Sequence, residues 1–371
     1  MKIALVHMRH AHSGGTELFL NKLSHYLAEK GEDVTIICRT HVETSHPNIK
    51  FVVLGGVTLG KAHRIWKFAK DVEKHVAKSA YDFVYGLGKT WTHDMLRIGG
   101  GTRMHLVNLI RQGKPNLKDK VAIAIERRSM ARGAYQHIIA NSHKSALEIQ
   151  EAYHVPSDDI SVIHNFVDTK RFTRITDPSV LQQHRDAIGL DASLPTFIFL
   201  GTGYKRKGLI SVLNAFAKLS FKANLIIAGR ESQLADYQQK AKELHIADAC
   251  YFLGEKGNPE LYFSLADCYV FPTQYEPFGF TVIEALSCGI PVITTDQCGA
   301  KEVINDKVST ILPKGFAIDS LTDAMSSWVN HQDKISLAQQ CRDTALKLDV
   351  DVVLEENYQA ILKQASKLSS S

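Results

Sequence analysis

Short apolar runs alternate with amphipathic segments along the whole chain. The runs at residues 2–8 and 33–38 are almost continuously apolar, as buried parallel strands are. The segment at residues 61–79 instead places apolar residues three or four positions apart, which predicts a helix with one buried face. Further strand-like runs lie at residues 83–85, 137–140, 160–163, 196–200, 224–228, 250–253, 268–271, 291–294 and 310–312. This alternation predicts an α/β fold with parallel sheets covered by helices.

The alternation occurs in both halves of a chain of 371 residues, which is long for one hydrophobic core. We therefore expect two Rossmann-like, doubly wound domains facing a central cleft, at residues 1–168 and 169–351. A C-terminal helix at about residues 352–371 can pack back on the first domain. Ligands of such sheets bind beyond the carboxyl ends of the strands.

Composition is that of an ordinary folded protein, with 44% hydrophobic and 22% charged residues. The six cysteines are scattered without C-x-x-C spacing, which favours reduced core thiols over disulfides or a zinc site. No uncharged apolar run is long enough to span a membrane, and the first residues lead directly into a short strand. We expect a cytoplasmic protein.

Positive charge is concentrated in one segment. Residues 61–132 contain sixteen Lys or Arg and six acids, a net charge of +10, which leaves −5 for the rest of the chain. One interpretation is a solvated face. The alternative is attraction to an anionic acceptor or to anionic lipid at the inner face of the cytoplasmic membrane, as a peripheral protein. Nucleic acid is not expected, since no binding motif accompanies the charge.

The segment at residues 274–286 holds the most informative pattern. A turn-prone Glu-Pro-Phe-Gly loop follows an apolar run and opens onto a predicted helix at residues 281–287. A helix start binds anions, and here Glu276 and Glu284 bracket it. Carboxylates accept paired hydrogen bonds from sugar hydroxyls. A ligand with phosphate between two hydroxylated groups satisfies both features, so this segment predicts a nucleotide-sugar site.

Two other motifs fall at predicted strand ends. Gly14 and Gly15 stand between the first strand and the first helix, where backbone can approach a ligand closely. After the run at residues 196–200, the basic group Lys205, Arg206 and Lys207 is suited to binding phosphate. Neither motif has the G-x-G-x-x-G spacing of a dinucleotide site.

Residues 55–62 nearly match the phosphate-binding loop of ATPases. Ala62 stands where a Ser or Thr hydroxyl must reach Mg²⁺, so we do not expect ATPase chemistry.

In combination these motifs resemble the retaining GT-B glycosyltransferases of family 4. The segment 276–285 is similar to their E-x7-E signature, and residues 289–293, 141–142, 162–168, 206–208 and 14–15 match family positions in order. The resemblance covers essentially the whole chain. The short first domain and the basic segment are similar to lipopolysaccharide-core glucosyltransferases.

The resemblance implies a role for each donor-side residue. Glu284 would accept hydrogen bonds from ribose hydroxyls, and Glu276 from the transferred sugar. Backbone amides around Phe278, Gly279 and Phe280 would hold the distal phosphate. Arg206 and Lys207 would neutralise the diphosphate as it leaves, which stabilises the transition state. Gly14 and Gly15 would let the first domain close on the donor.

The acceptor side is expected within residues 90–105, where related enzymes often place a His or an Asp; His105 and Asp94 are the candidates for a general base. The family implies retention at the anomeric carbon, with the leaving phosphate assisting the acceptor. The only D-x-D sequence, at residues 349–351, lies far from any donor loop, so neither a metal ion nor another cofactor is expected.

Three functions remain open. The first is transfer of a hexose from a nucleotide sugar, UDP-sugar foremost, to a cell-envelope glycan or glycolipid such as lipopolysaccharide core. The second is epimerisation of a nucleotide sugar on the same fold, and the third is non-catalytic binding of a nucleotide sugar. Turnover with and without an acceptor distinguishes the three.

Overall fold

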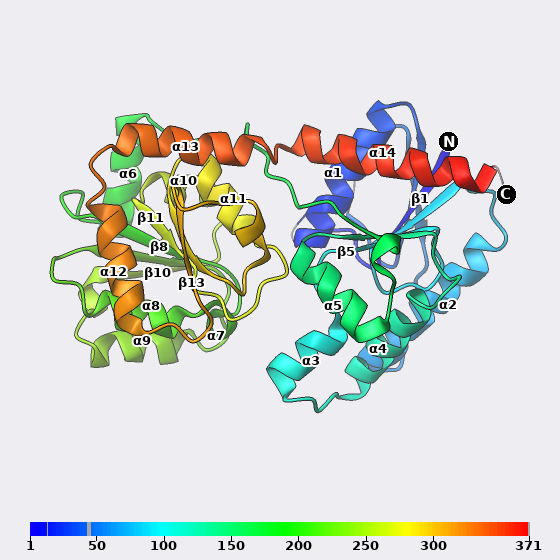
Figure 1. Cartoon of the computed structure of the whole chain (residues 1–371), viewed down its shortest axis with the longest axis horizontal. Coiled ribbons are helices and arrows are strands. Elements are labelled where there is room, and N and C mark those ends of the chain that lie inside the picture. Colours follow the sequence, from blue (N-terminus) through cyan, green and yellow to red (C-terminus); the bar gives the residue numbers. More distant parts are fainter. Residues whose placement is uncertain (13, 43–45, 370–371) are drawn as a thin grey trace. The chain divides into compact units, whose positions relative to one another are not determined.

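The computed structural model describes residues 1–12, 14–42 and 46–369. The chain divides into two compact units (Figure 1). The N-terminal unit comprises the residues up to Asn165 and the segment from Asp351 on, and the C-terminal unit comprises Phe166–Val350. Each unit is described by itself.

The N-terminal unit is built on a seven-stranded parallel sheet in the order β3-β2-β1-β4-β5-β6-β7. The strands are β1 (Lys2–Val6), β2 (Asp33–Cys38), β3 (Ile49–Val53), β4 (Phe83–Gly86), β5 (Met95–Ile98), β6 (His137–Ala140) and β7 (Ile160–Val162). The helices are α1 (Gly15–Glu29), α2 (Gly60–Val76), α3 (Arg103–Arg111), α4 (Leu117–Ser129), α5 (His143–Tyr153) and α14 (Val350–Ser369), with a short 3-10 turn η1 (Ser157–Asp159). The strand order reverses between β1 and β4, which is the doubly wound topology predicted from the sequence.

The C-terminal unit has a six-stranded parallel sheet in the order β10-β9-β8-β11-β12-β13. Its strands are β8 (Thr196–Leu200), β9 (Asn224–Ala228), β10 (Cys250–Gly254), β11 (Cys268–Val270), β12 (Val292–Thr295) and β13 (Ser309–Leu312). Its helices are α6 (Pro178–Ile188), α7 (Tyr204–Lys207), α8 (Leu209–Phe216), α9 (Leu234–Glu243), α10 (Pro259–Ser264), α11 (Phe280–Ser287), α12 (Ile318–Val329) and α13 (Lys334–Leu346), with 3-10 turns η2 (Ala247–Ala249) and η3 (Gly299–Glu302). Here the order reverses between β8 and β11.

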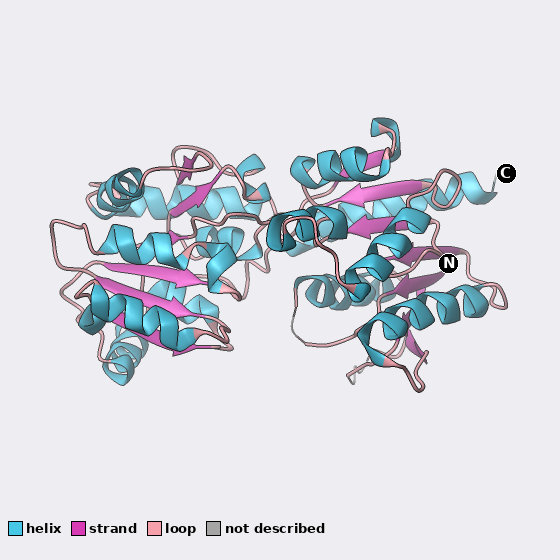
Figure 2. Ribbon diagram, turned by 90° about the horizontal axis from the view of Figure 1, so that it is seen from below, coloured by secondary structure: helices cyan, strands magenta, loops and turns pink. Residues whose placement is uncertain are grey.

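Helices cover both faces of each sheet (Figure 2), which explains why the strands are apolar throughout and do not alternate. Every residue from Ile3 to Val6 of β1 is fully buried. In β8, Phe197 and Ile198 are fully buried and Thr196 is almost fully buried. The α/β fold class with two doubly wound parallel sheets is thus confirmed.

Local signals also set the helix ends. The hydroxyl of Ser142 accepts a hydrogen bond from the amide of Ser145 at 3.0 Å and so caps α5. The amphipathic segment at residues 61–79 forms α2 up to Val76, with Phe68 and Val72 buried against the sheet and Ile65 buried beside α4. These ends therefore follow from residue chemistry that is visible in the sequence.

Strand β5 is not among the strands predicted from the sequence, and it lies within residues 90–105, where we expect the acceptor side. Met95, Leu96 and Ile98 are buried in the sheet, and the charged Arg97 is buried with them. The guanidinium of Arg97 lies 4.2 Å from the ring centroid of Phe19 and donates a hydrogen bond to Asn165 Oδ1 at 3.0 Å. The sequence pattern misses this strand because a buried arginine interrupts a run of only four residues.

Helix α14 packs on the N-terminal unit through polar contacts. The hydroxyl of Tyr358 donates to Glu32 Oε1 at 2.6 Å, and the hydroxyl of Tyr85 donates to Asn357 Oδ1 at 3.2 Å. The last helix in the sequence thereby belongs to the unit that contains β1.

All six cysteines are buried free thiols. Within residues 1–12, 14–42 and 46–369, no helix has the length and apolar character needed to cross a membrane.

Candidate functional site

Three charged side chains meet at the carboxyl edge of the C-terminal sheet. Arg206 and Lys207 lie on α7, which follows β8, and Glu276 lies in the loop that follows the neighbouring β11. Nη1 of Arg206 donates to the carbonyl of Tyr275 at 2.6 Å and lies 3.3 Å from Glu276 Oε2. Nζ of Lys207 forms an ion pair with the same oxygen. We call Arg206, Lys207 and Glu276 the charged cluster.

Lys207 is the most buried member of the charged cluster, with 8% of its surface exposed. Its Nζ also lies 4.7 Å from the ring centroid of Phe271. Burial, and next the charge of Arg206, lower the pKa of Lys207 to about 7. The carboxylate of Glu276 acts in the opposite direction, because it stabilises the ammonium form. The ion pair with Glu276 thus favours the ammonium form of Lys207.

The segment after β12 holds the loop that carries Glu276 in place through backbone hydrogen bonds. The amide of Gly299 donates to the carbonyl of Glu276 at 3.0 Å, and the amide of Ala300 donates to that of Phe278 at 2.7 Å. A Cβ on Gly299 would overlap the carbonyl of Pro277, so only glycine allows this close approach. The loop is thus a preorganised structure.

Helix α11 begins directly after this loop. Gly279 is its N-cap residue, with φ of 111°, and no side chain caps the helix start. A Cβ at Gly279 would lie 3.0 Å from Cys298 Sγ. The hydroxyl of the buried Tyr269 donates a hydrogen bond to the hydroxyl of Thr281 at 2.7 Å. The helix start therefore presents backbone amides and the positive end of its dipole, which suits an anionic group.

Glu284 lies on the second turn of α11 and differs from Glu276 in having no partner. It is half-buried, and its carboxyl group makes no hydrogen bond or ion pair with any residue that the structure describes. Burial is the main cause that raises the pKa of Glu284 to about 7; the charge of Arg171 lowers it and that of Glu260 raises it. A half-buried carboxyl without a partner costs folding free energy in the protein without ligand. It is suited to accept hydrogen bonds from a ligand.

The predicted glycine pair lies in the N-terminal unit, between β1 and α1. Gly14 is the N-cap residue of α1, with φ of 115°, and Gly15 is the first helical residue. A Cβ at Gly14 would overlap the carboxylate of Glu17, which accepts a hydrogen bond from Arg9 Nε at 2.7 Å. Glu17 is a residue that the sequence reasoning did not single out, and it occupies the first turn beside this glycine.

His105 and Asp94 occupy different edges of the N-terminal sheet. His105 lies in the first turn of α3, after β5, with its side chain 41% exposed and its Nε2 3.8 Å from Oε1 of the buried Glu148. Asp94 instead precedes β5 at its amino end, and its Oδ2 accepts a hydrogen bond from the amide of Val84 at 2.7 Å. Burial raises the pKa of Asp94. Asp94 holds two strands together, so we keep His105 alone for the acceptor side.

The structure thus gathers the predicted donor-side residues of the C-terminal unit, Arg206, Lys207, Glu276, Phe278, Gly279, Phe280 and Glu284, around the start of α11. Two residues outside the predicted segment 274–286, Cys298 and Gly299, position the loop through hydrogen bonds and close packing. Their sequence signal, a glycine shortly after a strand, is too weak to single out a residue.

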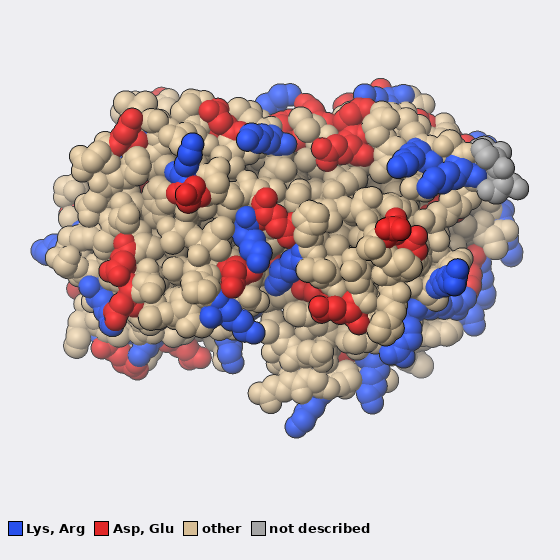
Figure 3. Space-filling view, in the orientation of Figure 1, with Lys and Arg blue, Asp and Glu red and all other residues tan. Residues whose placement is uncertain are grey.

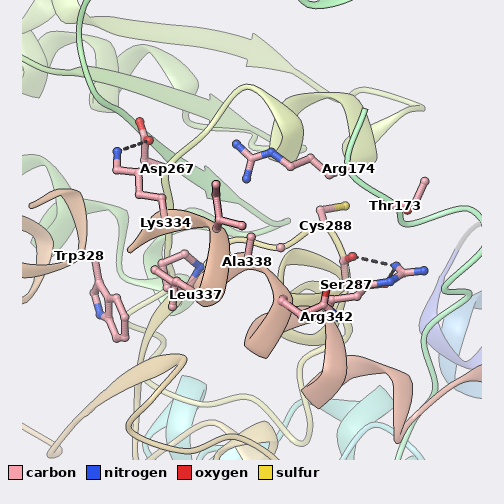
Figure 4. Close-up of a pocket in the computed structure, with 14 residues that line it drawn as sticks. Thr173, Arg174, Asp267, Ser287, Cys288, Trp328, Lys334, Leu337, Ala338 and Arg342 are labelled. Atoms are coloured by element: carbon pink, nitrogen blue, oxygen red, sulfur yellow. Dashed lines mark hydrogen bonds and ion pairs between the residues drawn. The ribbon is translucent and has the colours of Figure 1, made fainter. Parts of the chain in front are cut away.

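A separate cavity of about 530 Å³ lies at the other end of α11 (Figure 4). It is lined by Ser287 and Cys288 from the end of α11, by Leu337 and Arg342 of α13, and by the ion pair of Lys334 with Asp267. Arg342 Nη1 donates to the carbonyl of Ser287 at 2.8 Å. This cavity contains none of the predicted site residues.

The profile of Glycosyltransferase Family 4 matches residues 13–171, and that of glycosyl transferases group 1 matches residues 181–348. A curated relative, N-acetyl-alpha-D-glucosaminyl L-malate synthase of Bacillus anthracis, is 24% identical over 309 residues, covering 78% of each protein.

Two solved structures have the same fold. WaaG, a glycosyltransferase involved in lipopolysaccharide biosynthesis, superposes with a TM-score of 0.82 at 18% identity, covering 97% of this chain and 99% of WaaG. Anabaena HepE in complex with UDP-glucose gives a TM-score of 0.74 at 19% identity, with both chains covered completely.

The two matched profiles together span most of the chain, and the two sheets match the GT-B architecture of these structures. The protein is therefore a glycosyltransferase of the GT-B fold. It combines an N-terminal Glycosyltransferase Family 4 domain with a C-terminal glycosyl transferases group 1 domain.

Proposed function

We propose that this glycosyltransferase moves a hexose from a UDP-sugar to a cell-envelope glycan or glycolipid, with lipopolysaccharide core as the favoured acceptor, and with retention at the anomeric carbon. The observation that carries the donor assignment is the pairing of two unlike acids at one helix start. Glu276 is fully engaged by Arg206 and Lys207, whereas Glu284 has no partner among the described residues.

In this proposal the start of α11 binds the distal phosphate and Glu284 binds the ribose hydroxyls. Glu276 then serves two purposes: it accepts hydrogen bonds from the sugar, and it holds Arg206 and Lys207 beside the diphosphate. As the bond to the sugar breaks, negative charge grows on the phosphate, and these two cations stabilise that charge. The leaving phosphate is then available to take the proton of the attacking hydroxyl.

UDP as the carrier is supported by HepE, whose structure holds UDP-glucose. An envelope acceptor is supported by WaaG, which is involved in lipopolysaccharide biosynthesis. On the acceptor side we propose His105 as the catalytic candidate. Its imidazole is half-exposed and lies on the edge where ligands of the N-terminal sheet bind. We expect no metal ion or other cofactor in the reaction.

We also propose peripheral attachment to anionic membrane at the cytoplasmic face through the basic segment 61–132. Lys and Arg side chains gather over α2 and the connection between α3 and α4 (Figure 3). Anionic vesicles should therefore retain the protein at low salt and release it as salt rises, whereas neutral vesicles should not retain it.

Alanine substitution of the charged cluster tests the transfer reaction. We expect Lys207→Ala and Glu276→Ala each to reduce transfer to an envelope acceptor by at least about a hundredfold, on the scale of losing one charge-stabilising group. Lys222→Ala is the control, because Lys222 is an exposed cation of the same unit outside the proposed site. Activity near the wild-type level in either cluster variant would remove that residue from the mechanism.

Because removal of Glu276 leaves Lys207 buried without its partner, the fold of Glu276→Ala must be checked by circular dichroism, with Glu276→Gln as a milder variant. A thermal-shift panel of nucleotide sugars identifies the donor, because a true donor stabilises the protein by mass action. If no nucleotide sugar stabilises the protein, the proposed function is wrong.

A further inference from the structure

A second cavity, of about 500 Å³, lies in the N-terminal unit between the first turn of α2 and the connection from α3 to α4. The side chains that give it its character are Leu59, Lys61, Arg103, Arg111, Leu117 and Lys118. Four of these six are cations and the other two are leucines. We call it the basic cavity.

One buried acid organises the cations of the basic cavity. Asp119 is fully buried, and it accepts a hydrogen bond from Arg103 Nε at 2.9 Å and lies 3.1 Å from Arg111 Nε. Burial opposes ionisation of Asp119, but its hydrogen bonds to Arg103 and Asn116 and the charges of the two arginines outweigh burial and lower its pKa. Asp119 therefore fixes both guanidinium groups in place and neutralises one of them.

The two lysines of the basic cavity remain uncompensated. Lys61 and Lys118 are exposed, and neither forms an ion pair with any residue in the described part of the chain. Two fixed arginines, two lysines and one carboxylate leave a net charge of about +3 around one hollow. Such a cluster is complementary to a group that carries more than one negative charge, as a phosphate ester does.

This arrangement gives a role to residues 55–62, which nearly match the phosphate-binding loop of ATPases. Their last residues form the first turn of α2, which no side chain of the N-cap residue Leu59 caps. Lys61 provides the cation, but Ala62 lacks the hydroxyl that would hold Mg²⁺. The segment therefore suits a phosphate bound without a metal ion better than a nucleoside triphosphate.

The leucines indicate what carries the phosphate. Leu59 is 83% exposed and Leu117 is 70% exposed, and both border the basic cavity. Large exposed apolar residues beside uncompensated cations are typical of surfaces that meet a lipid interface, where chains contact the apolar side chains and headgroups contact the cations.

We propose that the basic cavity binds the phosphate group of a membrane-borne amphiphile, with Leu59 and Leu117 against its acyl chains. The basic cavity borders the first turn of α2, which follows β3, and Arg103 in the first turn of α3, which follows β5; helices that follow these strands begin on the edge at which ligands of this sheet bind. This inference rests on the proposed envelope acceptor and makes it more specific: a phosphorylated lipid is held at one defined point, not by diffuse attraction to the whole basic segment.

Vesicle binding of charge-matched variants tests the proposal. The variant Lys61→Gln/Lys118→Gln removes two charges at the basic cavity, and Lys74→Gln/Lys78→Gln removes two exposed charges at the other end of α2. With vesicles of phosphatidylcholine containing phosphatidic acid, we expect about 30-fold weaker binding for the first pair. The control pair should lose less than about fivefold, because its charges act only through the general field.

Two further arms separate a lipid phosphate from free phosphate. Leu117→Ser should weaken binding to the same vesicles but leave the affinity for inorganic phosphate unchanged. Equal losses for both lysine pairs would overturn the discrete site, and tighter binding of inorganic phosphate than of the vesicles would overturn the lipid assignment.

Stabilisation by UDP-glucose should be the same in all these variants, since none of the substituted residues belongs to the proposed donor site. If UDP-glucose fails to stabilise even the wild-type protein, it is the proposed function that fails, and vesicle binding still decides the basic cavity independently.

Discussion

At the scale of single residues, the donor site depends on two acids with opposite surroundings. Glu276 accepts contacts from two cations, which keep it ionised and fixed. Glu284 has none, and burial raises its pKa to about 7. Hydrogen bonds from ribose hydroxyls favour the ionised form of Glu284, so ligand binding and loss of its proton are linked.

We therefore predict that UDP binds less tightly as the pH falls below about 7. The affinity should fall by up to about tenfold per pH unit, because the protonated form of Glu284 must first lose its proton. In Glu284→Gln the part of this dependence that comes from Glu284 should be lost. Isothermal titration calorimetry in buffers of different ionisation enthalpy measures both the affinity and the proton released; equal pH profiles for the two proteins would contradict this role.

At the scale of elements, α7 is joined to α8 at Gly208, which has φ of +85°. A Cβ there would overlap the carbonyl of Pro272, which lies just before the loop of Glu276. We predict that Gly208→Ala lowers the free energy of unfolding by about 3 kcal/mol, through backbone strain and this overlap together.

Gly189→Ala is the matched control, because Gly189 has φ of +70° with no atom within 4 Å of the added carbon. It should cost only the strain of about 1–2 kcal/mol. Urea denaturation compares the two variants, and equal losses would show that the contact with Pro272 is unimportant.

Helix α3 is tied to α4 by a carboxyl group that titrates near neutrality. Both oxygens of Glu126 accept hydrogen bonds from the amide of Arg103, at 2.8 and 3.1 Å, and one also accepts from the hydroxyl of Tyr153 at 2.5 Å. Burial, which outweighs these hydrogen bonds, raises the pKa of Glu126 to about 7.

Because the folded-state pKa of Glu126 lies above its ordinary value, the folded protein binds more protons than the unfolded chain between about pH 4.5 and 7. Its stabilising contribution is complete below that window and is lost as the pH rises through it, by about 3 kcal/mol at most. We predict that Glu126→Gln removes this part of the pH dependence of stability. Chemical denaturation across the window tests it, with the exposed Glu255→Gln as control.

The sequence predicts an element well where local residue chemistry determines it. It predicts less well where the element depends on a contact between residues far apart in the chain. The cap of α5 at Ser142 and the helix start at Gly279 follow from local chemistry. Strand β5 was missed because Arg97 satisfies its charge against Phe19 and Asn165, far away in the chain. Likewise, the ion pair of Lys207 with Glu276 spans 69 residues, so each residue could be predicted but not their contact.

At the scale of the whole molecule, the two units have separate sheets and separate cores. We predict that UDP stabilises the C-terminal unit selectively, by about 2.7 kcal/mol at a hundredfold excess over Kd. Hydrogen exchange read by mass spectrometry should then show slower opening of the strands β8 to β13, with little change in β1 to β7. Equal protection of both units would contradict an independent donor-binding unit.

Helix α14 has a consequence for how the protein is made. Tyr85 and Glu32, near the beginning of the chain, bind Asn357 and Tyr358 of this last helix, so the C-terminal unit is inserted within the N-terminal one. During synthesis all residues of the C-terminal unit are made before α14, which completes the N-terminal unit. A released chain truncated near residue 350 should therefore contain a complete donor-binding unit and an incomplete N-terminal unit that exposes the surface contacted by α14.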